Sequence, residues 1–215
     1  MLKDVAASTG DTVEYDSYAP GGYTLKQHAS DNNTINKIMI GNWDYVVLQE
    51  QSQRPAFPEY QVQADLYPYA RILDSLIRHY NSCAETVFYM TWGYKNGDAS
   101  NCANFPPICT YAGMDSMLRA RYMYMADTNN ALVSPVGAVR RYIRTNYPGI
   151  ELYDTDGAHP SLAGTYTAAC SFYSVLFRKN PLTISFNSTL TSGVAANIRT
   201  AAKAVAFDSL STWFV

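Results

Sequence analysis

The chain has few charged residues, few histidines and no long apolar run, and each shortage argues against a class of protein. Charged residues make up 16% of its 215 residues, and the formal net charge is −2. Because Lys and Arg form no block, we expect no nucleic-acid partner. The longest apolar runs, such as 45–48 and 87–90, have the length of a core strand. A membrane helix needs roughly 20 apolar residues, so we expect no membrane span.

Cysteine is also scarce, and its spacing argues against a metal centre. The four cysteines include no Cys-x-x-Cys pair, so we expect no metal ion. Cys102 and Cys109 bracket a short loop with two prolines, which could close as a disulfide in an oxidising compartment or stay reduced. Cys83 and Cys170 lie among apolar neighbours and are predicted to be buried thiols. The chain starts without a charged head and an apolar stretch, so we expect no secretory signal within it.

Tyrosine is abundant, with 18 residues, alongside many Asn, Ser and Thr. This composition is typical of extracytoplasmic or carbohydrate-handling proteins. A general bias in the codon usage or amino-acid composition of the source organism explains it equally well. A chain of this length can bury one full core but not two comfortable ones. We therefore expect a single domain over residues 1–215, with 181–215 as a C-terminal helical extension.

Apolar periodicity predicts strands that alternate with helices. The expected strands are 12–18, 43–49, 86–91 and 131–136, with 43–49 buried on both faces. The expected helices are 2–8, 24–40, 60–80, 114–129, 137–146, 162–178 and 192–209, the last capped by Ser192, with a core stripe of Met and Tyr over 114–125. Such alternation is typical of an α/β fold: a doubly wound, flavodoxin-like three-layer α/β/α arrangement with a parallel sheet. Active residues then collect at the carboxyl ends of the strands.

The most informative stretch is 156–161, which reads Asp-Gly-Ala-His-Pro-Ser. Asp156 precedes His159 by three residues on what should be a tight loop. A carboxylate in this place can accept the hydrogen bond of one ring N–H and leave the other ring nitrogen as a base. Such a pair can also merely stabilise a loop. Proline after the histidine and a helix after the proline favour the catalytic interpretation.

Three further loops follow predicted strands. Gly21 and Gly22 form a turn that exposes backbone N–H groups, and Trp92 follows the third strand, where its ring could line a sugar subsite or pack against its own loop. The loop 49–53 holds three glutamines. Glu50 lies among them and could act as a general acid, although a salt bridge to a nearby Arg, Arg54 or Arg71, is the better interpretation.

These blocks resemble those of the SGNH hydrolases, also called GDSL-type esterases, in the branch found among gut Bacteroides-type bacteria. The resemblance covers most of residues 1–180 and is most specific at 156–161. It implies that Asp156 and His159 complete a catalytic triad and that the Gly22 N–H points at the oxyanion. The family's third block carries an asparagine as a further oxyanion donor. Here glutamines stand in its place, with Gln51 favoured and Gln49 or Gln53 left open.

The departure from the family lies at the front. Its members open with a strand that ends in Gly-Asp-Ser or Gly-Asn-Ser and supplies the nucleophilic serine. This chain begins inside the helix that follows, so we expect the first strand and its serine to be missing through a start at an internal methionine. The nearest look-alike, Asp16-Ser17, comes one strand too late. Without a central strand the chain should be poorly stable alone.

The resemblance implies a serine esterase that acts on small acyl esters, such as acetyl esters of carbohydrates, without a metal or organic cofactor. The longer parent would be periplasmic or secreted, and the chain as given should be inactive. Two alternatives remain: a carbohydrate-binding or scaffold module on the same fold, and a transferase that moves an acyl group to a sugar. The sequence predicts a small-molecule or glycan ester as the partner and leaves the oligomeric state open.

Overall fold

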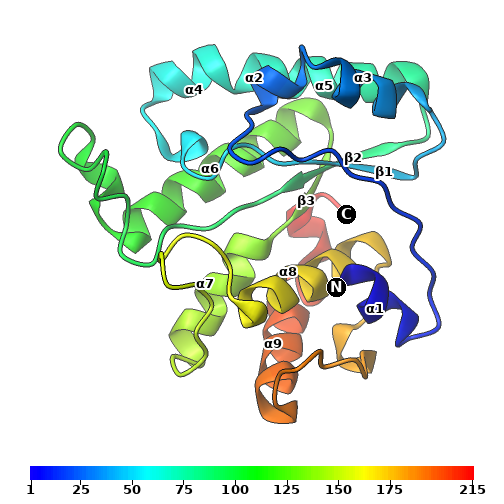
Figure 1. The fold of residues 1–215 in the computed structure, drawn as a ribbon, viewed down its shortest axis with the longest axis vertical. Helices are drawn as coiled ribbons and strands as arrows, with labels where there is room; N and C mark the ends of the chain where they lie inside the picture. Colours follow the sequence, from blue (N-terminus) through cyan, green and yellow to red (C-terminus); the bar gives the residue numbers. More distant parts are fainter. The chain divides into compact units, whose positions relative to one another are not determined.

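The computed structural model describes residues 1–215 and confirms the α/β class with a parallel sheet (Figure 1). One sheet holds three strands in the order β1 (Tyr45–Leu48), β2 (Glu85–Tyr89) and β3 (Leu132–Ser134). The α-helices are α1 (Leu2–Ala7), α2 (Leu25–His28), α3 (Asn32–Met39), α4 (Glu59–Asp65), α5 (Tyr67–Tyr80), α6 (Tyr111–Asn129), α7 (Val136–Asn146), α8 (Leu162–Leu176) and α9 (Ser192–Val205). Short 3-10 helices span Arg54–Ala56, Pro106–Cys109, Pro181–Thr183 and Phe207–Trp213.

The chain divides into two compact units. The sheet unit is made of residues 16–133, and the helical unit is made of residues 1–15 with 134–213. In the sheet unit, α5 and α6 pack on β2, while α2 and α3 pack on α5 (Figure 1). The apolar stripe of α6 is fully buried, as predicted; its members are Met114, Leu118, Tyr122 and Met125. This packing gives the sheet unit its core.

Two predicted strands differ from the structure. Residues 12–18 form no strand, because their backbone pairs with no neighbour. The segment is held through side chains instead, as when the Tyr18 hydroxyl donates to the Asp31 carboxylate at 3.0 Å. The strand β1 is not buried on both faces, and Val47 is 44% exposed. This strand lies at the edge of the sheet and has only β2 as its neighbour.

Two predicted helices are each divided. The helix expected over 24–40 breaks where the Asp31 side chain accepts the Asn33 N–H and so begins α3. The helix expected over 60–80 breaks at Leu66, whose backbone is not helical, and Pro68 lies in the first turn of α5. Proline is tolerated in a first turn but not in a helix interior. A side-chain cap in the first case and a proline in the second thus accompany a break in a continuous apolar period.

Two smaller predictions are also wrong. Helix α9 is capped by Thr191, whose hydroxyl accepts the Val194 N–H, rather than by Ser192. The cap therefore lies one residue earlier, in agreement with the usual uncertainty of helix ends. Cys170 is buried as predicted, but Cys83 is exposed. Cys83 lies in the turn between α5 and β2, where Asn81, Ser82 and Glu85 make its surroundings in sequence polar rather than apolar.

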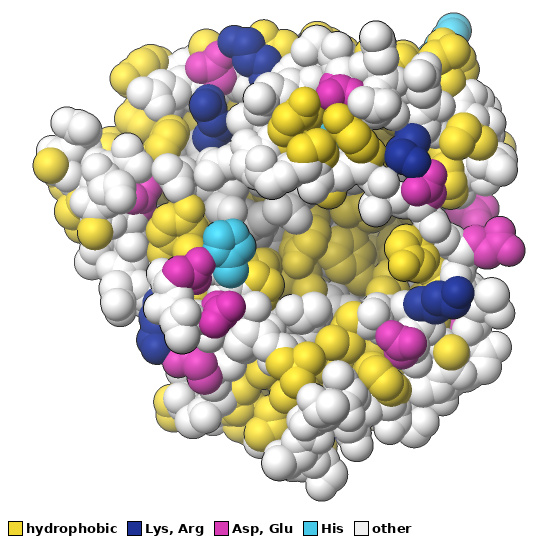
Figure 2. Space-filling view, viewed as in Figure 1, with side chains coloured by type: hydrophobic (Ala, Val, Ile, Leu, Met, Phe, Trp, Pro, Cys, Tyr) yellow, Lys and Arg dark blue, Asp and Glu magenta, His cyan; other side chains and the backbone are white.

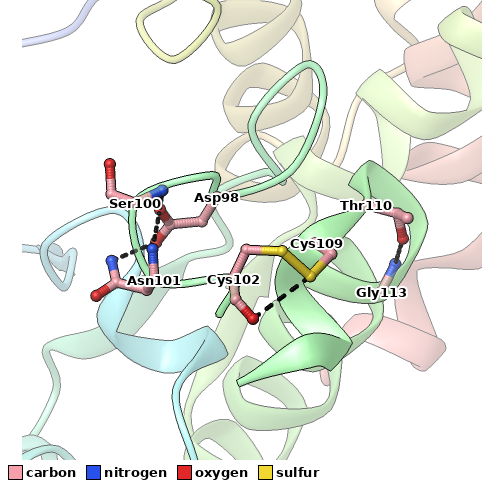
Figure 3. The surroundings of a disulfide bond; sticks show 7 residues. All are labelled: Asp98, Ser100, Asn101, Cys102, Cys109, Thr110 and Gly113. Atoms are coloured by element: carbon pink, nitrogen blue, oxygen red, sulfur yellow. Dashed lines mark hydrogen bonds between the residues drawn. A yellow bond between two sulfur atoms is a disulfide. The ribbon is translucent and has the colours of Figure 1, made fainter. Parts of the chain in front are cut away.

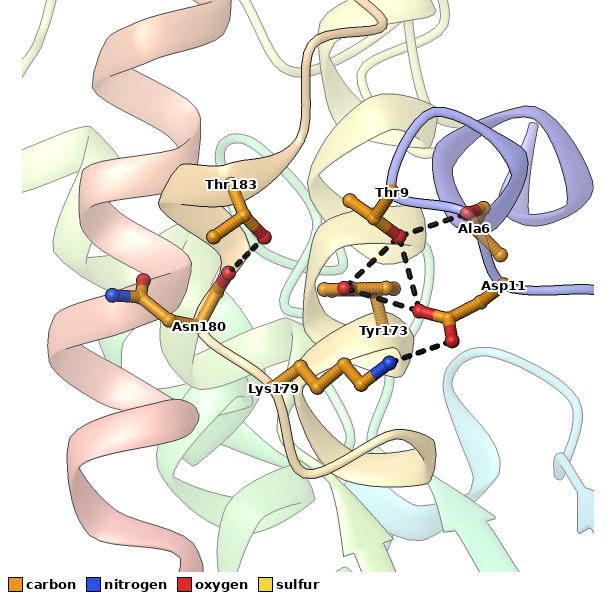
Figure 4. Close-up of polar contacts among 7 residues, drawn as sticks. All are labelled: Ala6, Thr9, Asp11, Tyr173, Lys179, Asn180 and Thr183. Carbon is orange, nitrogen blue, oxygen red and sulfur yellow. Dashed lines mark hydrogen bonds and ion pairs between the residues drawn. The ribbon is translucent and has the colours of Figure 1, made fainter.

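The core of the helical unit is α8, which packs against α1, α7 and α9. A polar network ties α1 to it (Figure 4). The buried Tyr173 of α8 places its hydroxyl 3.1 Å from the Thr9 hydroxyl, and Thr9 donates to the Ala6 carbonyl. Lys179 donates to Asp11 at 2.6 Å, and this bond holds the pKa of the Asp11 carboxyl below its ordinary value. The first helix is therefore anchored through both apolar and polar contacts.

The loop between β2 and α6 contains a disulfide between Cys102 and Cys109 (Figure 3). The Asp98 carboxylate organises the same loop by accepting the backbone N–H and the side-chain amide of Asn101. Gly97 has φ of +84°, and a Cβ there would lie 2.5 Å from the Cys109 carbonyl carbon. The structure therefore resolves the alternative left by the sequence in favour of the disulfide, with glycine required beside it.

None of the helices combines the length with the apolar character needed to cross a membrane. No cluster of His, Cys, Asp and Glu side chains could hold a metal ion. On the face shown in Figure 2, Lys and Arg side chains are scattered rather than gathered into one patch.

Candidate active site

The Asp-x-x-His motif lies on a tight loop between Tyr153 and α8, as predicted. Tyr153 and Pro160 form an isolated antiparallel bridge that closes the base of the loop. Inside it, the Asp154 N–H donates to the His159 carbonyl at 2.9 Å. Gly157 turns the chain with φ of +69°, a conformation that side chains with a Cβ rarely adopt. The loop is therefore defined by its own short-range bonds.

The Asp156 carboxylate makes three hydrogen bonds inside this loop. One oxygen accepts the backbone N–H groups of Ala158 and His159, each at 2.9 Å. The other oxygen is paired with Nδ1 of His159. The bond from His159 and the two backbone bonds lower the pKa of Asp156 to about 2, so the carboxylate is charged at neutral pH. It holds the proton on Nδ1 and leaves Nε2 as the basic nitrogen.

A buried arginine supports the base of the loop. Arg140 of α7 is fully buried, donates to the Leu152 carbonyl at 2.9 Å and stacks on the Tyr153 ring at 4.5 Å. Gly164 of α8 leaves room for the Leu152 carbonyl and the Arg140 side chain, since a Cβ at this position would lie 2.3 Å from the Leu152 oxygen. Sequence reasoning missed Arg140, because nothing local distinguishes it from the surface arginines of the same helix.

Two serines, Ser161 and Ser17, lie close in sequence to the predicted site residues. The Ser161 hydroxyl donates to the Glu151 carbonyl at 2.8 Å and accepts the Gly164 N–H, so it caps α8. Ser17 lies in the exposed segment that forms no strand, and its N–H donates to Asp16. That neither serine is the nucleophile stays a prediction.

In the sheet unit, the loops that follow β1 and β2 begin at the same end of the sheet, where the carboxyl ends of the two strands lie. The two strands are parallel, and Leu48 is in register with Phe88. The loops are tied together where the Tyr94 hydroxyl donates to the Gln53 side-chain oxygen. Trp92, in the loop after β2, is half-buried, with its ring 6.3 Å from that of Tyr89. The sheet therefore brings the predicted glutamine and tryptophan loops side by side.

The three glutamines differ in how their amides are used. Gln51 accepts the backbone N–H of Gln53 through its side-chain oxygen at 3.3 Å. Gln53 uses its oxygen to accept from Tyr94. Gln49 is exposed. The side-chain oxygen of Gln51 is thus engaged within its own loop, and its role as an oxyanion donor stays a prediction.

The glycine turn precedes α2. Gly22 is exposed and has φ of +74°, with open space where a Cβ would lie, so the backbone conformation rather than crowding favours glycine there. The Tyr23 N–H donates to the Pro20 carbonyl and closes the turn. Thr24 and Gln27 then form a capping box that begins α2.

The contacts of Glu50 differ from the predicted salt bridge. Glu50 forms no salt bridge with Arg54 or Arg71; its carboxylate is fully buried and accepts the backbone N–H groups of Leu25 and Gln51 at 3.0 and 2.7 Å. Burial raises its pKa to about 7 despite these bonds. No signal in the sequence marks this contact, because Leu25 lies 25 residues away.

The predicted site residues thus form two groups. The helical unit brings Asp156 and His159 together, and the sheet unit places the Gly22 turn, Gln51 and Trp92 near one edge of the sheet. That the two groups share one pocket stays a prediction.

Comparison with known proteins shows the fold. No protein-family model and no curated protein matches the sequence. The structure is similar to a DUF4886 family protein from Bacteroides uniformis, with a TM-score of 0.78 and 18% identity over 98% of this chain and 88% of the other. It is also similar to a candidate SGNH hydrolase from Slackia heliotrinireducens, with a TM-score of 0.62 and 25% identity over 81% of this chain and 90% of the other. The resemblance to the SGNH hydrolases is therefore confirmed for the fold.

Proposed function

We propose that the chain carries the acid–base dyad and the oxyanion donors of an SGNH-type serine esterase. The observation that carries the proposal is the Asp156–His159 pair, in which the carboxylate holds the Nδ1 proton and leaves Nε2 on an exposed ring. The likeness to a candidate SGNH hydrolase supports it. A pair that only stabilised its loop would gain nothing from an imidazole that is 78% exposed.

In the proposed reaction a serine hydroxyl attacks an ester carbonyl while Nε2 of His159 takes its proton. The imidazolium that forms is stabilised by Asp156 and later protonates the leaving alcohol. Negative charge on the carbonyl oxygen is met by the Gly22 N–H and the Gln51 amide. Loss of one such donor typically lowers turnover by about 100- to 1,000-fold.

The nucleophile is the one part that residues 1–215 do not supply by resemblance. We therefore propose that this chain, by itself, does not hydrolyse esters through His159. The substrates of the complete machinery would be small acyl esters, such as acetyl groups on carbohydrates, with the Trp92 ring as a platform for a sugar. The disulfide between Cys102 and Cys109 supports a periplasmic or secreted location, where such bonds persist.

A two-part experiment tests the proposal. In ¹⁵N NMR spectra the His159 ring should be protonated at Nδ1 in the neutral form, and Asp156→Asn should remove this preference, whereas His79→Ala, on the exposed end of α5, should not. A neutral His159 with its proton on Nε2 would contradict the dyad.

The second part measures hydrolysis of p-nitrophenyl acetate by the purified chain and by His159→Ala. Equal rates are expected. Turnover that His159→Ala abolishes would show that a nucleophile is present after all and would overturn the proposed inactivity.

A non-catalytic carbohydrate-binding module is the second candidate, favoured by the absence of a matching serine. It needs the Trp92 loop but not the dyad. Binding of acetylated xylo-oligosaccharides that persists unchanged in both Asp156→Asn and His159→Ala, but is lost in Trp92→Ala, would favour this candidate over the esterase.

A further inference from the structure

Glu50 is a buried acidic residue that the proposed reaction does not use. Its side chain is fully buried, and each carboxylate oxygen accepts a different backbone N–H. The donors are Leu25, at 3.0 Å, and Gln51, at 2.7 Å. A glutamine cannot make both bonds, because one end of its side chain is itself a donor. The chain therefore uses a carboxylate here for its two acceptor oxygens.

The two N–H groups belong to the two segments assigned to the oxyanion. Leu25 is the first residue of α2, and it follows the Gly22 turn by three positions. Gln51 carries the amide donor itself, in the loop after β1. One side chain thus links the glycine turn to the glutamine loop across 25 residues of sequence.

The surroundings of Glu50 make this link sensitive to protonation. Arg54, on the 3-10 helix after the loop, favours the charged form, and Asp65 of α4 disfavours it. Burial outweighs both and raises the pKa of Glu50 to about 7, while the hydroxyl of Tyr122, from α6, stays protonated beside it. A protonated carboxyl keeps one good acceptor oxygen and turns the other into a hydroxyl. One of the two backbone bonds is then weakened.

We propose that Glu50 is a positioning residue, which locks the Gly22 turn to the Gln51 loop and so holds the two oxyanion donors in register. The catalytic meaning of this link rests on the proposed esterase function, but the link itself does not. It follows that the ordering of the Gly22 turn depends on the side chain of a residue far from it in sequence.

Backbone NMR of the intact ¹⁵N-labelled chain tests the link. In Glu50→Gln, amide hydrogen exchange should be about tenfold faster or more at whichever of Leu25 and Gln51 loses its acceptor, and the order parameter at Gly22 should fall. In the wild type, the amide shifts of Leu25 and Gln51 should move together with pH, with a midpoint near 7. Glu59→Gln, on α4 in the same unit and exposed, is the matched control and should leave all three amides unchanged.

Unchanged motion at Gly22 in Glu50→Gln, with faster exchange confined to Leu25, would overturn the proposal, since Glu50 would then be a local structural residue only. Independent titration of the Leu25 and Gln51 amides would overturn it as well. Circular dichroism confirms that each variant is folded. None of these measurements involves Asp156 or His159, so the link and the esterase proposal fail separately.

Discussion

Two carboxylates, Glu50 and Asp156, each accept two backbone N–H groups, yet their acidities move in opposite directions. Glu50 is fully buried, and burial raises its pKa to about 7. Asp156 is about half exposed, and the bond from His159 lowers its pKa to about 2. Two carboxylates that each accept two backbone N–H groups therefore differ in acidity, because burial dominates at Glu50 and the bond from His159 dominates at Asp156.

The two carboxylates also differ in the span of the structure they organise. Asp156 acts on residues two and three positions along the chain, so its loop is complete in itself. Glu50 joins segments that are far apart in sequence, so its loop exists only when the sheet unit is folded. A local carboxylate can hold a catalytic base in place, whereas a long-range one can couple two loops.

The largest expected effect is a dependence of the chain's stability on pH, caused by Glu50. Because the folded pKa of Glu50 lies above its unfolded value, the folded chain binds more protons between about pH 4.5 and 7, and its stability falls as pH rises through that window. A difference of this size corresponds to about 3 kcal/mol in the free energy of unfolding between pH 5 and 8. Urea unfolding of the wild type and of Glu50→Gln should show this dependence only in the wild type.

The control for that measurement is Glu59→Gln, which should keep the wild-type dependence. Parallel curves for the wild type and Glu50→Gln would mean that the buried carboxylate does not titrate in this range, and the contrast with Asp156 would lose its basis.

A second test addresses the support of the local loop. In Gly164→Ala the added Cβ would lie 2.3 Å from the Leu152 oxygen and 2.6 Å from Arg140, so the base of the Asp156 loop must shift. We expect a loss of about 1–3 kcal/mol in urea unfolding. Gly193→Ala, in helix α9, meets nothing within 4 Å and should stabilise the chain by about 0.4–1 kcal/mol. Equal effects of the two alanines would show that Gly164 is not a contact point.

The features that could be predicted from the sequence are those set by residues close together in the chain. The motif at 156–161, the helices around it and the alternation typical of an α/β fold are visible in spacing alone, and the structure confirms the tight loop and the parallel sheet. The contacts of Glu50 and Arg140 were not predicted. Whether a charged residue is buried depends on which distant segments of the chain pack against it, and local spacing does not show this. The strand predicted over 12–18 was wrong for the same reason: alternation describes a strand, but only a paired neighbour makes one.

The smallest expected effect concerns Asp156 and has the opposite sign to that of Glu50. Its folded pKa lies below the unfolded value of 3.8, so its contribution to stability is present above pH 3.8 and is lost as pH falls toward about 2. Above pH 4, Asp156→Asn should leave the urea midpoint close to that of the wild type, because the side chain is open to water and its bonds are local. Between pH 4 and 2 the wild type should lose a small stabilisation that the variant never had. A larger loss at neutral pH would show that the loop supports more of the helical unit than its short-range bonds imply.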